Sequence, residues 1–157
     1  IHSGVIRNDI TRMDVDAIVN AANPALKMGG GVCGAIFSAA GAEKLQRECD
    51  AIKGCNVGEA VITKGYGLPA RFIIHTAGPV WRGGDRGEEE LLYNCYANSL
   101  NLALKHDLKS IAFPLISSGI YGYPKDQALQ IAISAIEKFL LKHEMTVYLV
   151  LYEKRSL

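Results

Sequence analysis

Two glycine-rich stretches hold the residues best suited to chemistry. The first, GGGVCGAIF at residues 29–37, places three consecutive glycines and Cys33 at the start of a helical pattern. The second, SSGIYGYPKD at residues 117–126, stands before another helical pattern. Glycine lets backbone N–H groups turn toward a ligand, and a helix N-terminus adds unpaired donors and a partial positive charge. Together the two loops predict a clamp for a diphosphate.

Little side-chain charge is available to such a clamp. Lys27 and Lys125 are the cationic side chains near the loops, so we expect backbone amides to carry most of the anion binding. The alternative for either loop is a tight turn between a strand and a helix that binds nothing.

A dinucleotide site is the other possibility raised by the first loop, which fits G-x-G-x-x-G at Gly29, Gly31 and Gly34. That motif should start directly after a strand and be followed by an acidic residue at the end of a second strand. Here PALKM separates the strand pattern from the glycines, and the acidic residues at a suitable distance, Glu48 and Asp50, fall in a helical segment. The context therefore disfavours a Rossmann site.

The elements that would position both loops alternate between strand and helix patterns. Strand patterns lie at residues 17–22, 59–69, 71–78, 110–117 and 146–152, and helical patterns at 31–53, 88–106 and 124–143. Gly41 is expected to divide the first helical segment. Continuous apolar strands are typical of a sheet buried on both faces, with ligands bound beyond the carboxyl ends of its strands. The sequence predicts one α/β domain over residues 1–157, a three-layer α/β/α sandwich with a central mixed, largely parallel sheet.

Composition argues against several classes of partner. The net charge of +1 over 157 residues supplies no field for a nucleic-acid backbone, so no nucleic-acid partner is expected. No segment resembles a signal peptide or a membrane span. The chain has four cysteines without a C-x-x-C pair or a histidine at zinc-ligand spacing, Cys33, Cys49, Cys55 and Cys95. We expect free thiols in a cytoplasmic protein, with no metal, no cofactor and no membrane partner.

Three linked motifs resemble the macrodomain family, in its MacroD-type branch and bacterial relatives. They are NAANPALKMGGGVCGAIFSAAG at residues 20–41, FIIHTAGP at 72–79 and ISSGIYGYP at 116–124. Their order and spacing match over nearly the whole chain. The resemblance implies ADP-ribose binding. It further implies hydrolysis of mono-ADP-ribose from acidic side chains, or deacetylation of O-acetyl-ADP-ribose.

Site residues follow from the resemblance by position. Asp9 would accept a hydrogen bond from the adenine amine, Ile10 would supply a backbone contact, and Tyr152 would stack on adenine. Asn23 would bind the distal ribose. Asn20 also belongs to the expected ligand-binding residues, with organising the loop as its main role. The amides expected to hold the two phosphates belong to Gly30, Gly31 and Val32 and to Ser118, Gly119, Ile120 and Tyr121, of which Tyr121 would also cover the distal ribose.

Two positions depart from the MacroD-type pattern. Cys33 stands where that branch has an aspartate thought to activate water, and Phe37 replaces an expected histidine. Cys33 is interpreted as a small packing residue at the helix start. The alternatives are a nucleophile, whose alkylation would abolish activity, and a bystander to catalysis in which the ligand's phosphate polarises the water. His75 is interpreted as a core residue, and Trp81 with residues 82–90 as a solvated connection.

Besides a cysteine hydrolase built on Cys33, two functions remain open from the sequence. One is a slow hydrolase of ADP-ribose esters that uses Asn23 and the Cys33 position and acts without a general base. The other is a non-catalytic reader of ADP-ribosylated protein. In both, the partner is ADP-ribose or an ADP-ribosylated protein.

Overall fold

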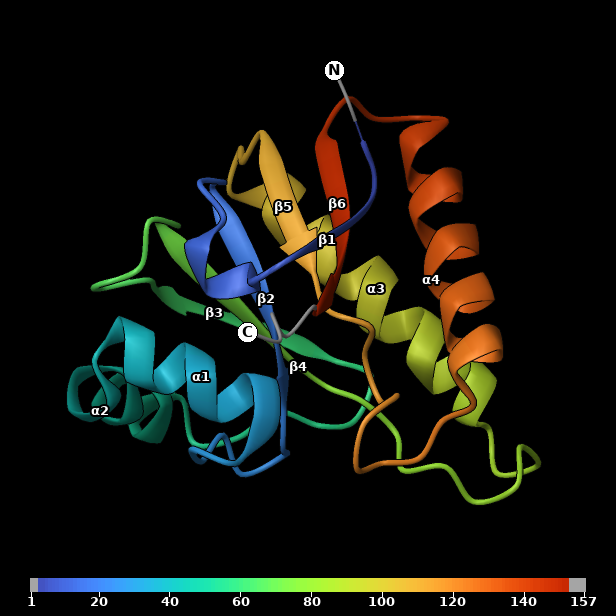
Figure 1. Cartoon of the computed structure of the whole chain (residues 1–157), viewed down its shortest axis with the longest axis horizontal. Coiled ribbons are helices and arrows are strands. Elements are labelled where there is room, and N and C mark those ends of the chain that lie inside the picture. The colour runs from blue at the N-terminus through green and yellow to red at the C-terminus, as the bar shows by residue number, and fades with distance from the viewer. Residues whose placement is uncertain (1–2, 153–157) are drawn as a thin grey trace, which may run out of the picture.

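A six-stranded sheet forms the centre of the molecule in the computed structural model, which describes residues 3–152 (Figure 1). The strand order is β1-β6-β5-β2-β4-β3. The strands are β1 (Gly4–Asn8), β2 (Ala17–Ala22), β3 (Ala60–Lys64), β4 (Phe72–Ala77), β5 (Ser110–Phe113) and β6 (Thr146–Tyr152). Residues 1–2 and 153–157 of the expected domain lie outside the described residues.

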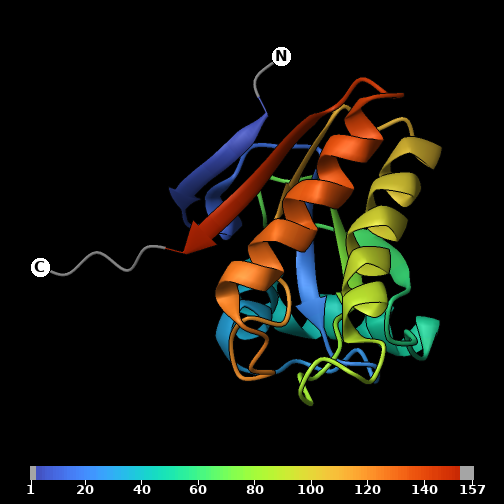
Figure 2. The ribbon, with the colours of Figure 1, turned by 90° about the vertical axis from the view of Figure 1, so that its right-hand side faces the viewer.

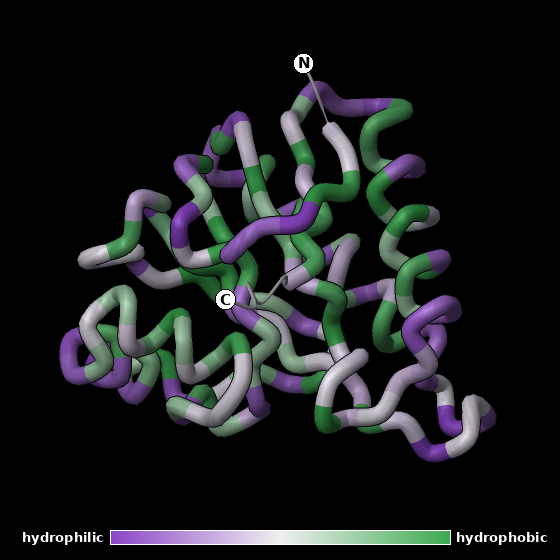
Figure 3. Tube along the Cα trace, in the orientation of Figure 1, coloured by the Kyte–Doolittle hydropathy of each residue, from purple (hydrophilic) through white to green (hydrophobic). Residues whose placement is uncertain are grey.

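Helices cover both faces of the sheet, as the α/β/α prediction required (Figures 1 and 2). They are α1 (Gly31–Ala40), α2 (Ala42–Ile52), α3 (Glu88–Lys105) and α4 (Lys125–Leu140). Successive residues of a strand point to opposite faces. Ile18 accordingly packs in the core beneath α1 and α2, while Val19 packs in the core beneath α3 and α4. Figure 3 shows hydrophobic residues gathered in the central strands.

The sheet is mixed, as predicted. All strand pairs are parallel except β3 with β4, which is antiparallel. Parallel pairing brings the carboxyl ends of β2, β5 and β6 to one edge, so the loops that follow β2 and β5 start at the same edge of the sheet. The fold thereby places both glycine loops together.

Gly41 divides the first helical segment as expected. Its φ of 110° lies in a region open to glycine but strained for other residues. Its N–H donates to the carbonyl of Phe37 at the end of α1, and its carbonyl accepts from Leu45 in α2. Gly41 is therefore both the C-cap of α1 and the N-cap of α2.

Strand β1 was missing from the predicted elements. It is an edge strand with mostly exposed residues and only Ile6 partly buried, so its sequence carries no apolar run. A short 3-10 helix, Ile10–Arg12, follows it. Pro114 follows β5, which ends at Phe113 and is shorter than the predicted 110–117. Within residues 3–152, no helix combines the length and apolar character needed to cross a bilayer.

Tyr96 on α3 secures the loop that leaves β5. Its side chain is fully buried, and its hydroxyl donates to the Pro114 carbonyl at 3.1 Å and accepts from the Ile116 N–H at 3.0 Å. One hydroxyl thus satisfies two buried backbone groups just before the second glycine loop.

Replacing Tyr96 by Phe should destabilise the protein by about 1–3 kcal/mol, because a buried N–H and a buried carbonyl lose their partner. Ser99→Ala is the matched control, since the buried Ser99 hydroxyl on the same helix has no partner among residues 3–152. That control should stay within about 0.5 kcal/mol of the wild type. Urea unfolding measures both, and equal losses in the two variants would contradict this role for Tyr96.

Candidate functional site

A cleft of about 790 Å³ lies at the carboxyl ends of β2 and β6, between the two glycine loops. Its walls include most of the side chains and loops predicted from the sequence. Those lining it are Asn23, Gly30, Gly31, Val32, Cys33, Ser118, Gly119, Ile120, Tyr121 and Tyr152. The topology therefore brings together residues more than a hundred positions apart.

Asp9 and Ile10 do not line this cleft. Asp9 caps the 3-10 helix, where its Oδ1 accepts from the N–H of Thr11 at 3.0 Å and from its hydroxyl at 2.7 Å. Ile10 is buried. Both follow Asn8, which pairs with Tyr152 across β1 and β6, so they lie next to the end of the cleft that Tyr152 lines.

Asn20 is also outside the cleft, which corrects its expected place among the ligand contacts. Its side chain is completely buried and donates to other side chains beneath the cleft floor. The expected role in organising the loop is the one its position allows.

The glycines of the first loop serve two different purposes. A Cβ on Gly30 or Gly31 would meet no protein atom within 4 Å, so both residues present bare backbone to the cleft. Gly31 also has a φ of +56°. A Cβ on Gly34, in contrast, would come 2.5 Å from the carbonyl oxygen of Gly29. Gly34 is therefore favoured by packing and Gly31 by its positive φ, while Gly30 leaves the backbone at the N-terminus of α1 uncovered.

The second loop has its own backbone bonds. Ser117 adopts a left-handed φ of 67°, its carbonyl accepts from Tyr123, and Gly122 donates to the carbonyl of Gly119. Ile120 stands at the tip and is 96% exposed. A Cβ on Gly78 would lie 2.3 Å from Ser117 Oγ, so the β4 strand end packs closely beneath the loop.

The connection at residues 81–90 is not simply solvated, which corrects the expectation from sequence. The backbone N–H of Trp81 donates to the Tyr121 carbonyl at 2.8 Å. The Trp81 ring packs on the Tyr123 ring with centroids 4.6 Å apart. This segment therefore supports the second glycine loop from behind.

Glu88 is the buried acidic residue that shapes this connection. Burial alone would raise the pKa of its carboxyl group, but the N–H groups of Arg82, Gly84 and Arg86 donate to it at 2.6–3.0 Å and bring the pKa to about 2. The Glu88 carboxylate thus fixes the conformation of residues 82–86 by accepting hydrogen bonds from three of their backbone N–H groups. Nothing in the run of three glutamates at residues 88–90 indicated that its first member is buried.

Asn23 closes the loop that begins after β2. Its Oδ1 accepts from the N–H of Lys27, and its Nδ2 donates to the carbonyl of the same residue at 2.8 Å. The ammonium of Lys27 pairs with Asp50 on α2 at 2.6 Å, so this cation does not line the cleft. Lys125 does line it.

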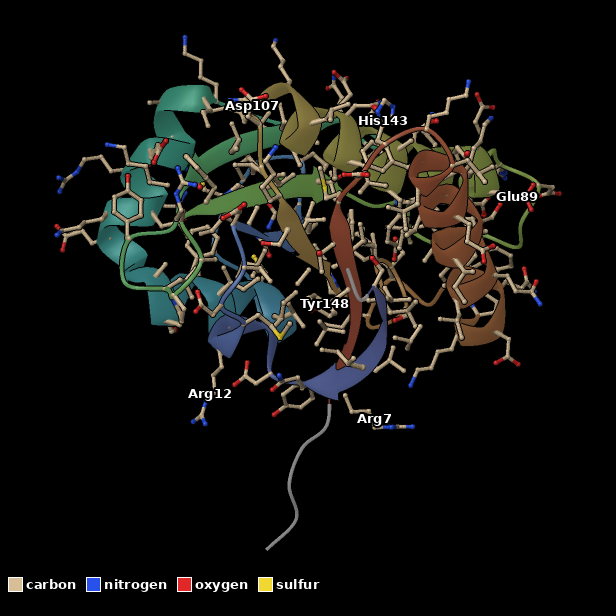
Figure 4. The ribbon with its side chains drawn as sticks, turned by 90° about the horizontal axis from the view of Figure 1, so that it is seen from above. Arg7, Arg12, Glu89, Asp107, His143 and Tyr148 are labelled. Carbon is tan, nitrogen blue, oxygen red and sulfur yellow. The ribbon has the colours of Figure 1, made fainter. Side chains whose placement is uncertain are left out.

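Arg7 is a cleft residue that the sequence reasoning missed. It projects from β1 at the edge of the molecule (Figure 4) and lines the cleft together with Tyr152. Only recognition of β1 as a strand beside β6 would have revealed it. With Lys125, it adds positive charge to a cleft that is otherwise lined mainly by backbone and apolar groups.

Cys33 faces the cleft from the first turn of α1 and is 7% exposed. Its Sγ accepts from Asn20 Nδ2 at 3.6 Å and donates to the Lys27 carbonyl at 3.8 Å. Among residues 3–152 its hydrogen-bond partners are thus an amide and a carbonyl, neither of which can take a proton from the thiol. This environment disfavours Cys33 as a nucleophile.

His75 lies in the core beneath Asn20, as interpreted from the sequence. It is fully buried, and burial lowers its pKa to about 4. Phe37 packs against the ring edge to face at a centroid distance of 6.4 Å. Within the described residues, no cluster of histidine, cysteine and acidic side chains is placed to hold a metal ion.

Comparison with known proteins identifies related chains. The family model described as Macro domain matches residues 19–132. A Macro domain-containing protein of Methanosarcina mazei is 56% identical over 97% of this chain and 82% of its own length. An O-acetyl-ADP-ribose deacetylase of Citrobacter rodentium is 49% identical over 97% of this chain and 89% of its own length.

Solved structures give the same result. The Oceanobacillus iheyensis macrodomain with ADP superposes with a TM-score of 0.89 at 44% identity, covering 96% of this chain and 83% of that one. The Trypanosoma brucei macrodomain in complex with ADP-ribose gives 0.87 at 43% identity, covering 95% of this chain and 63% of that one. Both the fold and the sequence therefore point to one family.

The neutral, buried His75 should make stability depend on pH. Because its pKa falls from 6.5 to about 4 on folding, the unfolded chain binds more protons between these values. The contribution of His75 to the free energy of unfolding is complete above pH 6.5. As the pH falls toward 4, this free energy decreases by on the order of 3 kcal/mol. Urea unfolding at several pH values measures the slope.

His75→Gln is the control for this pH dependence. In this variant the free energy of unfolding should change less with pH between 6.5 and 4. Glu88 contributes to the pH dependence mainly below 4.5, the ordinary pKa of its carboxyl group. An unchanged slope in the variant would assign the pH dependence to other groups.

Proposed function

The chain belongs to the macrodomain family, and on that premise we propose that it binds ADP-ribose in the cleft between its two glycine loops. The observation that carries the proposal is the pair of bare backbone surfaces facing one cleft. Gly30 and Gly31 line one side and Gly119 the other, and a Cβ at any of them would meet no protein atom within 4 Å. A diphosphate fits such surfaces because it needs many N–H donors at short range.

In the proposed pose, the diphosphate lies between the N-terminus of α1 and residues 118–121. Adenine stacks on Tyr152 at the end of β6, with Asp9 and Ile10 next to it. An acceptor such as the Asp9 carboxylate selects adenine over guanine, which carries a carbonyl where adenine has an amine. The distal ribose then lies near Asn23, Tyr121 and Cys33.

Support for this ligand comes also from the related proteins. Two similar solved structures hold ADP in one case and ADP-ribose in the other. The positive side chains of Arg7 and Lys125 line the same cleft, which favours an anionic ligand. The net charge over the whole chain is only +1, so we expect no nucleic-acid partner.

The proposed reaction is hydrolysis of mono-ADP-ribose from acidic side chains, or deacetylation of O-acetyl-ADP-ribose. A relative carries the latter name. Glycosidic cleavage needs a positioned water and support for positive charge that develops at the ribose carbon. A phosphate oxygen of the ligand would supply both. Among residues 3–152, Cys33 has an amide and a carbonyl as its hydrogen-bond partners, so it has no base to activate it. Turnover without a general base is expected to be slow.

The second candidate is a reader that binds ADP-ribosylated protein and does not cleave it. Two observations favour it. Cys33 occupies the position of the usual aspartate, and Phe37 is buried against His75 rather than available to the cleft. All four cysteines are free thiols in the structure, which supports a cytoplasmic location for either function.

Gly119→Glu tests the diphosphate clamp. A carboxylate on this open position would face the phosphates, so we expect ADP-ribose affinity to fall at least about tenfold. Gly4→Glu is the control, since a Cβ on Gly4 also meets nothing but lies outside the cleft. Isothermal titration calorimetry measures both, and wild-type affinity in Gly119→Glu would argue against the pose.

Turnover separates the enzyme from the reader. Incubation with a substrate mono-ADP-ribosylated on glutamate should release ADP-ribose slowly, and Asn23→Ala should abolish the release. Cys33→Asp should quicken release by about 10²-fold or more, if a missing general base limits the rate. Chromatography of free ADP-ribose measures both. Binding without release would leave the reader function, and absence of binding as well would end the ADP-ribose proposal.

A further inference from the structure

A chain of buried polar contacts runs from the core of the sheet to the cleft. Thr63 on β3 contacts His75 Nε2 at 2.9 Å, and His75 Nδ1 contacts Asn20 Nδ2 at 3.0 Å. Asn20 Nδ2 also donates to Cys33 Sγ at 3.6 Å. Thr63, His75 and Asn20 are all at most 2% exposed. The chain therefore connects an inaccessible histidine to a residue that lines the cleft.

The hydrogen-bond partners assign the direction of each bond. Asn20 Nδ2 can only donate, so His75 Nδ1 accepts and the ring carries its proton on Nε2. Nε2 then donates to Thr63 Oγ1, whose own proton goes to the Lys64 carbonyl at 3.2 Å. The pKa of about 4 keeps the ring neutral, as this arrangement requires.

Asn20 depends on His75 for its orientation. Its carbonyl oxygen Oδ1 is buried and has no partner among residues 3–152. Only the two contacts of Nδ2 fix the carboxamide, and the contact with sulfur is the longer one. The bond to His75 is thus the main constraint on which way the Asn20 amide points.

Beyond Asn20, the contacts reach both candidate catalytic positions. Cys33 Sγ donates to the Lys27 carbonyl, and the same carbonyl accepts from Asn23 Nδ2 at 2.8 Å. The loop that holds Asn23 and the first turn of α1 therefore meet at one oxygen atom. A shift of Cys33 would therefore move the Lys27 carbonyl oxygen, to which Asn23 is also bonded.

We propose that His75 is a positioning residue of the cleft, which orients the Asn20 carboxamide and through it Cys33 and the Asn23 loop. The proposal rests on ADP-ribose binding as the function. It assigns a role in ligand affinity to a residue that never touches the ligand. This role differs from a purely structural one, because the Nδ1 contact connects through Asn20 to the cleft residue Cys33, whereas the Nε2 contact goes to Thr63 on β3.

Two substitutions separate the two sides of the ring. An Asn side chain at position 75 can place its amide group where Nδ1 lies and keep a partner for Asn20. A Gln side chain can place its amide group where Nε2 lies. It would keep the hydrogen bond to Thr63 and lose the one to Asn20. We expect His75→Gln to weaken ADP-ribose binding about tenfold, and His75→Asn to stay within about threefold of the wild type.

Calorimetry with ADP-ribose and the thermal unfolding midpoint are measured for both variants. Both remove the ring from the same buried site, so a structural role alone would lower stability and affinity together in the two. The matched control is Thr76→Val, which removes the buried hydroxyl bond to the Glu59 carbonyl one residue further along β4 and should leave affinity unchanged. Equal affinities in His75→Gln and His75→Asn would overturn the proposal.

The wild-type protein provides a second test if the variants do not fold. Addition of ADP-ribose should shift the NMR signals of the Asn20 side-chain amide and the His75 ring nitrogens, whereas those of exposed His106 should stay unchanged. Unshifted Asn20 and His75 signals at saturating ADP-ribose would overturn the proposal. A wild-type protein that does not bind ADP-ribose would instead refute the proposed function, which keeps the two failures distinguishable.

Discussion

An anion held mainly by backbone N–H groups is the constraint on which the cleft depends. Side chains contribute little charge here, because Lys27 pairs with Asp50, and among residues 3–152 only Arg7 and Lys125 bring cations to the lining. Amides can replace them where the backbone lies close to the anion, which glycine favours, and where the donors are not used inside a helix. Parallel pairing of the central strands meets both conditions, since it starts the two glycine loops at one edge of the sheet.

The groups behind the loops are as specific as the loops themselves. Tyr96 satisfies two backbone groups where the chain leaves β5, and Trp81 binds the Tyr121 carbonyl from the adjoining connection. Glu88 holds that connection through three N–H donors. On the other side, Asn20 and His75 support the start of α1. A cleft of backbone amides thus rests on buried hydroxyl, carboxylate and imidazole groups.

The resemblance of three motifs indicated the family. The layers of the fold and the place of both glycine loops were predicted from apolar runs and glycine clusters, which are local signals. The sequence reasoning missed β1 and therefore Arg7, since an exposed edge strand leaves no apolar pattern. It placed Asn20 among the ligand contacts and Glu88 in a solvated connection, although both are buried. Burial of a polar residue depends on partners distant in sequence, and neither partner was visible from local spacing. The ligand roles of the remaining cleft residues stay predictions.

Amide chemical-shift mapping during an ADP-ribose titration tests the central claim most directly, because it observes the backbone N–H groups themselves. The amides of Gly30, Gly31, Val32, Gly119 and Ile120 should shift together and saturate with one dissociation constant. Shifts confined to other parts of the molecule, or no shifts in a folded protein, would contradict a cleft that binds a diphosphate through its backbone.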